Sequence, residues 1–400
     1  MRVVFVLGTT FGGTGEHVRM LVEGMRERGH QVAVVGPRSV EESFGFRAAG
    51  ARFVEIPLSD RPHPVADARS VATVRRVVHE ADVVHAHGLR AGSVAALARV
   101  GQRRRAPLVV TLHNALTAGG LVGTVYGVLE RIVARGADHV LAVAPDLGAR
   151  MAALGARDVR PAVVPAYPPG PPVRTVAEVR AELGVGRRPV VLTVARLAQQ
   201  KGLELLLDTA AIGSAAARGG ADTAPGHGGR GSAAEATATD PGRGGERGTG
   251  RPGGDGPLFV IAGEGPLRGE LQARIDAEAL PVRLLGFRKD IPDLLAAATL
   301  VLWPSRWEGQ PLSLSEALMA GRPVVATAVG GVPDLLGGAG TLVPYGDAAA
   351  MRAAVQEIVD DPAKAEALAR AAARRGGELP GEADAVESVL AVYSSSRSPG

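Results

Sequence analysis

The sequence predicts an α/β fold with two domains, each built around a parallel sheet. Short apolar runs of strand length alternate with helical patterns along most of the chain. A proline-dense segment, 161–172, separates this alternation into two sets. At 400 residues and 46% hydrophobic side chains, the chain is long enough to bury two cores of ordinary size.

The first domain is expected to cover residues 1–170. Its strand-like runs are 3–7, 31–35, 83–87, 108–113 and 140–143. A glycine-rich loop, 9–15, follows the first run and leads into a helical pattern at 17–25. The proline-dense segment that ends this domain is predicted to be a stiff, exposed linker.

The second domain is expected to cover residues 175–380. Its strand-like runs are 189–194, 258–262, 282–287, 300–303, 324–329 and 341–343. Helical patterns lie at 203–211, 267–279, 290–298, 312–320, 348–360 and 362–375. Residues 381–400 are expected to form a terminal helix and tail that pack back toward the first domain.

Residues 213–256 interrupt the second set of elements. This segment has 15 glycines in 44 residues and almost no large apolar side chain. Such a composition cannot bury enough surface to offset the entropy of ordering the chain. It therefore predicts a disordered insertion in a surface loop.

Composition excludes several classes of protein. Because the chain has no cysteine, disulfide frameworks and cysteine-based metal sites are impossible, and an intracellular location is the default. No apolar run approaches the length of a membrane span, and the first run is too short for a secretory signal. Aromatic residues make up only 3% of the chain, which argues against stacking on nucleic acid.

Positive charge is concentrated in the first half of the chain. Residues 1–170 hold 21 Arg and 14 Asp or Glu, a net charge of +7, whereas residues 171–400 carry −3. An anionic partner, either a small molecule or the inner face of a membrane, is favoured by two groups of adjacent arginines, Arg75-Arg76 and Arg103-Arg104-Arg105. The alternative is that these arginines form ordinary solvated helix faces in an arginine-biased chain.

The stretch 300–333 carries the strongest indication of chemistry. A buried strand, a Pro- and Gly-rich turn, a helix and a second strand predict a βαβ unit, whose helix amino terminus favours an anionic ligand. Two carboxylates flank that helix start, Glu308 and Glu316. The structural alternatives are a solvated loop carboxylate for Glu308 and a capping box with Ser313 for Glu316. For Trp303 and Trp307 the alternative is plain packing.

Further candidates lie at the ends of predicted strands. His87 and His113 each end a strand, where open α/β sheets keep their sites, although a lone strand-end histidine is often structural. Arg196 and Lys201 lie in one strand-to-helix loop and could converge on a diphosphate. The loop Gly12-Gly13-Thr14-Gly15 could allow a phosphate or sugar to approach the backbone closely, or could be a simple turn.

Taken together, these residues resemble a family 4 glycosyltransferase of the GT-B fold. The motifs that carry the resemblance are Gly12-Gly13, Thr111-Leu112-His113, Arg196 with Lys201-Gly202, Gly263-Glu264-Gly265, Gly286-Phe287, and Glu308 with Glu316 in Glu-x7-Glu spacing. The resemblance implies two Rossmann-like domains facing a central cleft. It also implies a retaining, metal-independent transfer of a sugar from a nucleoside diphosphate, with the nucleotide on the second domain and the acceptor on the first.

The resemblance also implies roles for single residues. Arg196 and Lys201 would hold the diphosphate, Glu308 would contact the donor sugar, and His113 would lie beside the 6-position of that sugar; these four are the catalytic candidates. Glu316 would bind the ribose, and Arg288 would lie near the base. The remaining donor-binding candidates are Gly12, Gly13, Gly263, Gly309, Gln310, Pro311 and Leu312.

The expected substrate is a nucleoside diphosphate sugar, with UDP or GDP as the nucleotide, and neither a cofactor nor a metal is expected. Gln310-Pro311 departs from the aromatic residue and glycine that many members have, so the donor sugar stays open. The acceptor is expected to be anionic or lipid-linked, in cell-envelope or glycoconjugate biosynthesis, with the protein cytoplasmic or peripheral on the inner membrane face. The alternatives are an epimerase or phosphorylase on the same fold, or a non-catalytic sugar- or nucleic-acid-binding protein.

Overall fold

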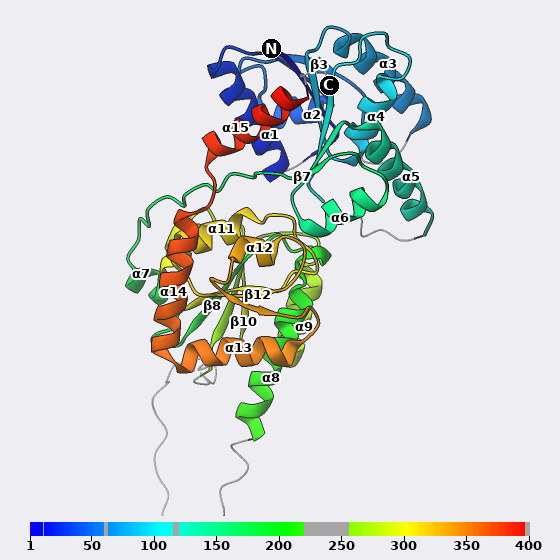
Figure 1. The fold of residues 1–400 in the computed structure, drawn as a ribbon. Helices are drawn as coiled ribbons and strands as arrows, with labels where there is room; N and C mark the ends of the chain where they lie inside the picture. Colours follow the sequence, from blue (N-terminus) through cyan, green and yellow to red (C-terminus); the bar gives the residue numbers. More distant parts are fainter. Residues whose placement is uncertain (11, 60–62, 115–119, 220–255, 397–400) are drawn as a thin grey trace, which may run out of the picture.

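The chain forms two α/β units, each with one parallel sheet (Figure 1). The computed structural model describes residues 1–10, 12–59, 63–114, 120–219 and 256–396. Every strand pairing between neighbours in both sheets is parallel. The expected α/β architecture of two units, each with a parallel sheet, is therefore confirmed.

The first unit holds a seven-stranded sheet in the order β3-β2-β1-β4-β5-β6-β7. Its strands are β1 (Arg2–Leu7), β2 (Gln31–Gly36), β3 (Arg52–Glu55), β4 (Val83–His87), β5 (Leu108–Leu112), β6 (His139–Ala142) and β7 (Val159–Pro161). Its helices are α1 (Gly13–Glu27), α2 (Arg38–Phe44), α3 (Pro64–Val78), α4 (Leu89–Ala98), α5 (Gly120–Gly136) and α6 (Pro145–Ala153). Two apolar clusters cover the faces of this sheet, as fully buried parallel strands require.

The second unit holds a six-stranded sheet in the order β10-β9-β8-β11-β12-β13. Its strands are β8 (Val190–Val194), β9 (Leu258–Ala262), β10 (Val282–Gly286), β11 (Leu300–Trp303), β12 (Val324–Thr327) and β13 (Thr341–Val343). Its helices are α7 (Val176–Glu182), the short η1 (Gln199–Lys201), α8 (Leu203–Gly219), α9 (Arg268–Glu278), α10 (Ile291–Ala297), α11 (Leu312–Met319), α12 (Val332–Leu336), α13 (Ala348–Asp360) and α14 (Pro362–Gly377).

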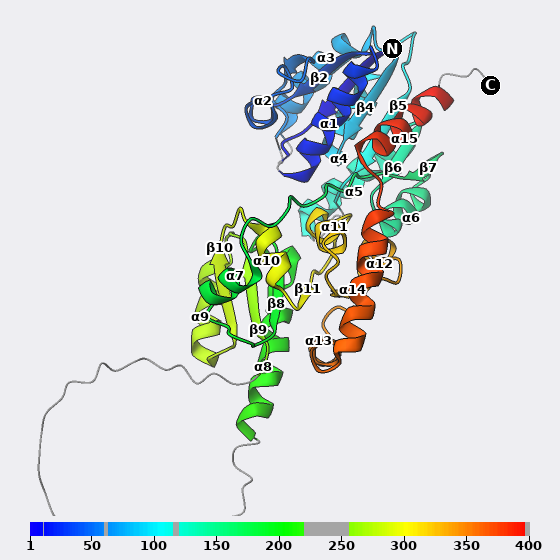
Figure 2. The same ribbon diagram turned by 90° about the vertical axis from the view of Figure 1, so that its left-hand side faces the viewer.

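The last helix, α15 (Glu382–Ser395), leaves the second unit and packs on α1 of the first (Figures 1 and 2). Its apolar face, including Val386 and Val389, joins the apolar cluster beneath α1. Gly24 of α1 permits this approach, because a Cβ there would stand 2.6 Å from Val386 Cγ2. The first unit is therefore completed by the end of the chain.

Two details of the second half differ from expectation. Helix α8 continues to Gly219, so residues 213–219 are helical rather than part of a disordered insertion, while 220–255 lie outside the described residues. The proline-dense linker is not fully exposed, since Val164 and Ala166 are buried. Ala166 N–H donates to Pro380 O at 2.8 Å, which places both segments that cross between the units side by side.

The strands expected from apolar runs are present within one or two residues of their predicted ends. Two edge strands, β3 and β7, were not predicted because they are short and carry little apolar sequence. No helix in the described ranges combines the length and apolarity that a membrane crossing requires.

Candidate active site

The two units meet where the carboxyl ends of both sheets face each other. The loop after β11 contacts the loops after β5 and β6 of the other unit. Trp307 Nε1–H, for example, donates to Asp146 Oδ2 at 2.7 Å. The strand ends singled out in the sequence therefore come together at one interface, as expected for open parallel sheets.

Glu308 lies at the centre of this interface and is only 4% exposed. Its Oε1 accepts hydrogen bonds from Lys201 Nζ at 2.6 Å, Ser305 Oγ at 2.7 Å and Trp303 Nε1 at 3.3 Å. Among the described residues, Oε2 has no hydrogen-bond partner. The alternative of a solvated loop carboxylate is therefore wrong, and one oxygen is left for a ligand.

The loop after β8 is attached to the loop after β11. Gln200 O accepts from Arg306 N–H at 2.8 Å, and Gln200 Nε2 donates to Trp307 O at 3.0 Å. Gly202 adopts a φ of 59°, and a Cβ there would stand 2.0 Å from Pro304 O. Only glycine allows this close approach, which brings Lys201 onto Glu308.

Arg196 lies in the same loop as Lys201 but differs from it in environment. Its side chain is exposed, and it makes no ion pair with any residue in the part of the chain that the structure describes. Lys201, by contrast, has a side chain only 21% exposed and is paired with Glu308. The two expected diphosphate-binding cations therefore comprise one unpaired guanidinium and one ammonium held by a carboxylate.

Gly263 supports this loop through its backbone. With a φ of 151°, it packs so closely that a Cβ would lie 1.9 Å from Ala195 O. In the same loop, Leu197 N–H donates to Glu264 O at 3.0 Å. Gly263 and its neighbour Glu264 therefore hold the loop that carries Arg196 in place.

Glu316 projects from α11, one turn beyond the start of the helix. The N-cap residue of α11 is Pro311 and no side chain caps this helix, so the capping box between Ser313 and Glu316 is wrong. The Glu316 carboxyl has no hydrogen-bond partner among the described residues, and burial raises its pKa. A half-buried, unpaired carboxyl remains for a ligand.

Residues 309–312 form the contact between the units. A Cβ on Gly309 would stand 2.6 Å from Val143 Cγ2 and 3.1 Å from His113 O. Gln310 Nε2 donates to Val164 O at 3.3 Å, and Pro311 is buried. The Leu312 side chain lies 3.2 Å from the position that a Cβ on Gly13 would take.

The glycine loop of the first unit ends at this contact. Gly12 is the N-cap of α1 with a φ of 62°, and its carbonyl accepts from Gly15 N–H and Glu16 N–H. No side chain caps α1. The amino terminus of this 15-residue helix therefore faces the region of the interface beside Leu312, with its first N–H groups available to an anion.

His113 is partly buried and lies against a cluster of buried histidines, His17, His85 and His87. His113 Nε2 and His87 Nδ1 are 3.0 Å apart, and the His17 ring lies 5.7 Å from that of His113. Burial lowers the pKa of His113 to about 3 and that of His17 to about 4. His113 is therefore neutral near pH 7, which suits a hydrogen-bonding role rather than that of a cationic acid.

The cluster extends to the end of the chain. His85 Nδ1 lies 2.7 Å from the hydroxyl of Tyr393 in α15, and His85 Nε2 lies 2.7 Å from Thr111 Oγ1. His17 and Tyr393 were absent from the sequence-based candidates. Helical spacing along 17–25 indicated only a core position for His17, and nothing local links residue 393 to residue 85.

Arg288, which was expected near the base, is bound to two carboxylates of the second unit. Its guanidinium bonds Asp290 through Nε at 2.7 Å and Glu182 through Nη1 at 2.7 Å, and Nη2 contacts both carboxylates. These carboxylates raise its pKa. These four hydrogen bonds join α7 to the loop before α10 and leave one N–H of Nη1 without a partner among the described residues.

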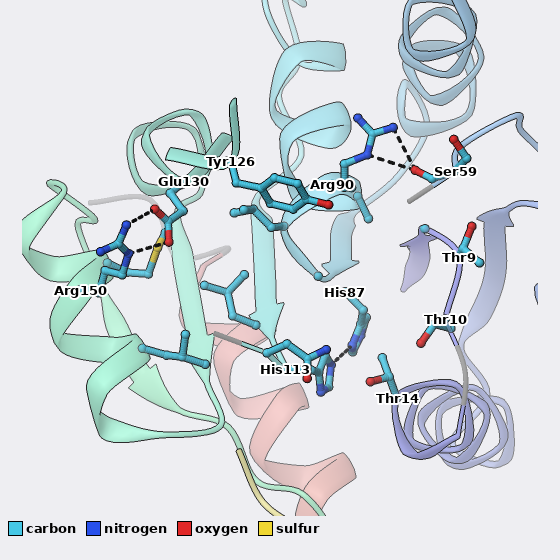
Figure 3. Close-up of a pocket in the computed structure, with 18 residues that line it drawn as sticks. Thr9, Thr10, Thr14, Ser59, His87, Arg90, His113, Tyr126, Glu130 and Arg150 are labelled. Carbon is cyan, nitrogen blue, oxygen red and sulfur yellow. Dashed lines mark hydrogen bonds and ion pairs between the residues drawn. The ribbon is translucent and has the colours of Figure 1, made fainter. Parts of the chain in front are cut away.

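A cavity of about 290 Å³ opens in the first unit beside His113 (Figure 3). Its walls come from the ends of β1, β4 and β5 and from α5 and α6. Thr10 and Thr14 lie near the two histidines, while the Glu130–Arg150 pair and Arg90 line other parts of the wall. His113 therefore borders both this cavity, through its ring, and the interface with the second unit, through its carbonyl.

Two family models match the chain in succession. Residues 12–167 match the glycosyl transferase 4-like domain, and residues 255–361 match glycosyl transferases group 1. The first range covers most of the first unit and the second covers the second unit from β9 to α13; together they span about two thirds of the chain.

Similar proteins include the alpha-D-kanosaminyltransferase of Streptomyces kanamyceticus, 32% identical over 203 residues, which are 49% of this chain and 43% of that protein. The D-inositol 3-phosphate glycosyltransferase 1 of Catenulispora acidiphila is 37% identical over 150 residues, 34% of this chain and 36% of that protein. The matched stretches thus span less than half the length of these curated relatives.

Among solved structures, Anabaena HepE in complex with UDP superposes with a TM-score of 0.74 at 22% identity, covering 99% of this chain and 100% of that one. WaaG, a glycosyltransferase involved in lipopolysaccharide biosynthesis, gives a TM-score of 0.65 at 16% identity, covering 98% and 99%. The sequence motifs, the two matched family models and the shared architecture lead to one conclusion: the chain belongs to the family 4 glycosyltransferases of the GT-B fold.

Proposed function

We propose that this protein is a retaining glycosyltransferase that moves a sugar from a nucleoside diphosphate sugar to an acceptor held by the first unit. The observation that carries the proposal is the buried Glu308, bonded to Lys201 and adjacent to His113 through Gly309. The names of the relatives, a kanosaminyltransferase and an inositol 3-phosphate glycosyltransferase, support sugar transfer. Complexes of HepE with UDP and with UDP-glucose support a nucleotide-sugar donor.

In the proposed reaction, the bond between sugar C1 and the β-phosphate oxygen breaks, and the acceptor hydroxyl oxygen bonds to C1 on the same face. The proton of that hydroxyl passes to the departing nucleoside diphosphate. Negative charge grows on the leaving oxygen, where Arg196 and Lys201 stabilise it. No metal is required in this scheme, because the two cations and a helix amino terminus supply the positive charge.

The carboxylates act as binding groups in this scheme. Three donors hold Glu308 Oε1, so the carboxylate is fixed in orientation and its Oε2 can accept from sugar hydroxyls. The unpaired carboxyl of Glu316 suits the ribose hydroxyls. Arg288 stays a candidate for the base, although Glu182 and Asp290 hold most of its guanidinium N–H groups.

The test is a panel of UDP-, GDP- and ADP-sugars. We expect one nucleotide to raise the melting temperature, and its sugar to be transferred with the anomeric configuration kept, as read from the proton coupling at C1. Activity should persist in EDTA. A product with the inverted anomeric configuration would contradict the retaining mechanism. Loss of activity in EDTA, with recovery in magnesium, would contradict metal independence. If no nucleotide changed the melting temperature, the proposed function itself would be contradicted.

A further inference from the structure

His87 is a buried residue that the proposed reaction leaves without a role. It ends β4 and is only 4% exposed. Its Nδ1 lies 3.0 Å from Nε2 of His113, and the planes of the two rings are inclined by only 20° (Figure 3). The ring centroids are 5.3 Å apart, which is the N···N distance extended by about one ring radius on each side. The two nitrogens therefore point at each other, as a hydrogen bond requires.

This bond carries a single proton. Burial lowers the pKa of His87 well below its ordinary value and that of His113 to about 3, so both imidazoles are neutral near pH 7. A neutral imidazole has one N–H and one bare nitrogen. Either His87 Nδ1–H donates to His113, or His113 Nε2–H donates to His87. Each choice also fixes the state of the outer nitrogen of both rings, the one that is not in the bond.

The outer nitrogen of His87 decides between the two arrangements. This atom, Nε2, is buried and has no hydrogen-bond partner among the described residues. If His113 were the donor, His87 would carry its proton on Nε2, and a buried N–H would have no acceptor. Orphaned N–H groups are rarer in protein interiors than unsatisfied acceptors. The proton therefore belongs on Nδ1 of His87, where an acceptor lies 3.0 Å away.

The outer nitrogen of His113 is in a different environment. His113 is partly exposed and lines the cavity, and its Nδ1 is not among the buried atoms that lack a partner. A proton on this atom can therefore be donated to water or to a ligand. Neighbouring rings hold His87 in place, because those of Phe5, His17 and His85 have centroids 5.7, 5.8 and 4.2 Å from its own.

We propose that His87 is a positioning residue for sugar transfer: it keeps the shared proton on its own Nδ1, so that His113 presents Nδ1–H to a hydroxyl oxygen of the bound donor sugar. The inference rests on the proposed function, in which that sugar lies beside His113. Without His87, His113 can carry its proton on either nitrogen, and only a fraction of the molecules then offers the N–H to the sugar.

The first test needs no ligand. Long-range proton–nitrogen correlation NMR of the full chain, labelled with isotope-enriched histidine, shows which nitrogen of each neutral ring is protonated. The signals that disappear in His113→Gln and in His87→Asn assign the two rings. We expect a proton on Nδ1 of both His87 and His113, and a proton on Nε2 of His113 would overturn the proposal.

The second test measures the consequence for the donor sugar, using the member of the UDP-, GDP- and ADP-sugar panel that is transferred. His87→Phe keeps an aromatic ring without an N–H. It should give His113 a mixture of protonation states and weaken binding of the nucleotide sugar roughly tenfold, the scale of one net hydrogen bond. His87→Asn keeps an N–H near the position of Nδ1 and should restore most of this loss. Affinity for the nucleoside diphosphate alone should stay unchanged in both variants, because it has no sugar.

Val83→Ala, at the buried start of the same strand, is the control for a change in the core. It should lower the melting temperature but alter neither the protonation of His113 nor the ratio of the two affinities. Equal losses in Val83→Ala and His87→Phe, or no recovery in His87→Asn, would overturn the proposal. A wild-type chain that binds no nucleotide contradicts the proposed function, whereas nucleotide-sugar binding with the proton on Nε2 of His113 contradicts only the role of His87.

Discussion

At the scale of single residues, removing Arg196 is expected to affect turnover alone, whereas removing Lys201 is expected to affect both turnover and stability. Both lie in the loop after β8, yet Arg196 is exposed and Lys201 is bonded to the buried Glu308. Removing Arg196 leaves no buried group unsatisfied. Removing Lys201 leaves a buried carboxylate without its cation, which costs free energy of folding.

We therefore expect Arg196→Ala to reduce turnover by roughly two to three orders of magnitude, the scale of losing one preorganised donor, with an unchanged melting temperature. Lys201→Ala should reduce turnover similarly and also lower the free energy of unfolding by about 1–3 kcal/mol. Steady-state kinetics and thermal unfolding measure the two effects. Arg187→Ala, at an exposed position before β8, is the control and should change neither turnover nor melting temperature. If Arg196→Ala and Lys201→Ala were equally stable, the structural role of the Lys201–Glu308 pair would be contradicted.

The buried histidines make stability depend on pH. His17 has its pKa lowered from 6.5 to about 4 by burial, so the folded chain binds fewer protons than the unfolded chain below pH 6.5. Stability is therefore fully present above pH 6.5 and falls as the pH drops toward 4. The other members of the cluster, with pKa values lowered in the same direction, add to this slope.

The measurement is the melting temperature of the chain and of His17→Phe between pH 7.5 and 5.5. The wild-type value should fall over this range, and the variant should fall less, because one group that resists protonation has been removed. His79→Phe, at an exposed histidine that ends α3, should keep the wild-type slope. Identical slopes for all three chains would show that His17 does not contribute.

At the scale of elements, glycines set how closely the loops of the site approach one another. Gly202 and Gly263 bring loops together within the second unit, whereas Gly309 brings that unit against the first. Added atoms at Gly202 or Gly263 would meet backbone, which cannot move aside. At Gly309 the nearest atom belongs to the side chain of Val143, so the strain there can be relieved by a second change.

Gly309→Ala should therefore lower kcat/KM by separating Glu308 from His113, with little loss of stability within either unit. Val143→Ala should restore part of the activity in the double variant, because it removes the methyl group that stands 2.6 Å from the new Cβ. A double-mutant cycle on kcat/KM gives the coupling. Additive losses would show that the contact does not set the distance between the units.

At the scale of the whole molecule, the chain crosses between the units twice. The segment 162–172 crosses first, and residues 378–381 cross back to α15, joined by the hydrogen bond between Ala166 and Pro380. Among the described residues, the units also touch through the loops of the site, as at Gly309 and Val143.

Helix α15 belongs to the core of the first unit, although it is the last element of the chain. Ending the chain after Gly381 removes five buried residues of α15, including Tyr393, and uncovers the apolar face of α1. At about 1.5–3 kcal/mol for each large apolar side chain, this loss is comparable with the whole stability of a domain. Calorimetry should show the first unit melting at a much lower temperature while the second keeps its transition, and a single unchanged transition would contradict this.

The sequence by itself determined the fold class, the division into two units and most of the site. Parallel strands buried on both faces need continuous apolar runs, and their carboxyl ends must share one edge, so His113, Arg196, Lys201, Glu308 and Glu316 could be chosen from strand-end positions and the family pattern. Composition also predicted an insertion at 213–256; its first seven residues instead continue α8, and 220–255 lie outside the described residues.

Contacts between distant segments were decided only by the tertiary structure. No local pattern distinguishes Lys201 bonded to Glu308 from a free cation, or Arg288 bonded to Glu182 and Asp290 from an unpaired guanidinium, because each partner arrives from another part of the chain. The same holds for the link from Tyr393 to His85, 308 positions apart. Periodicity reports which face of an element is buried, whereas the partner that buries it depends on how the elements pack.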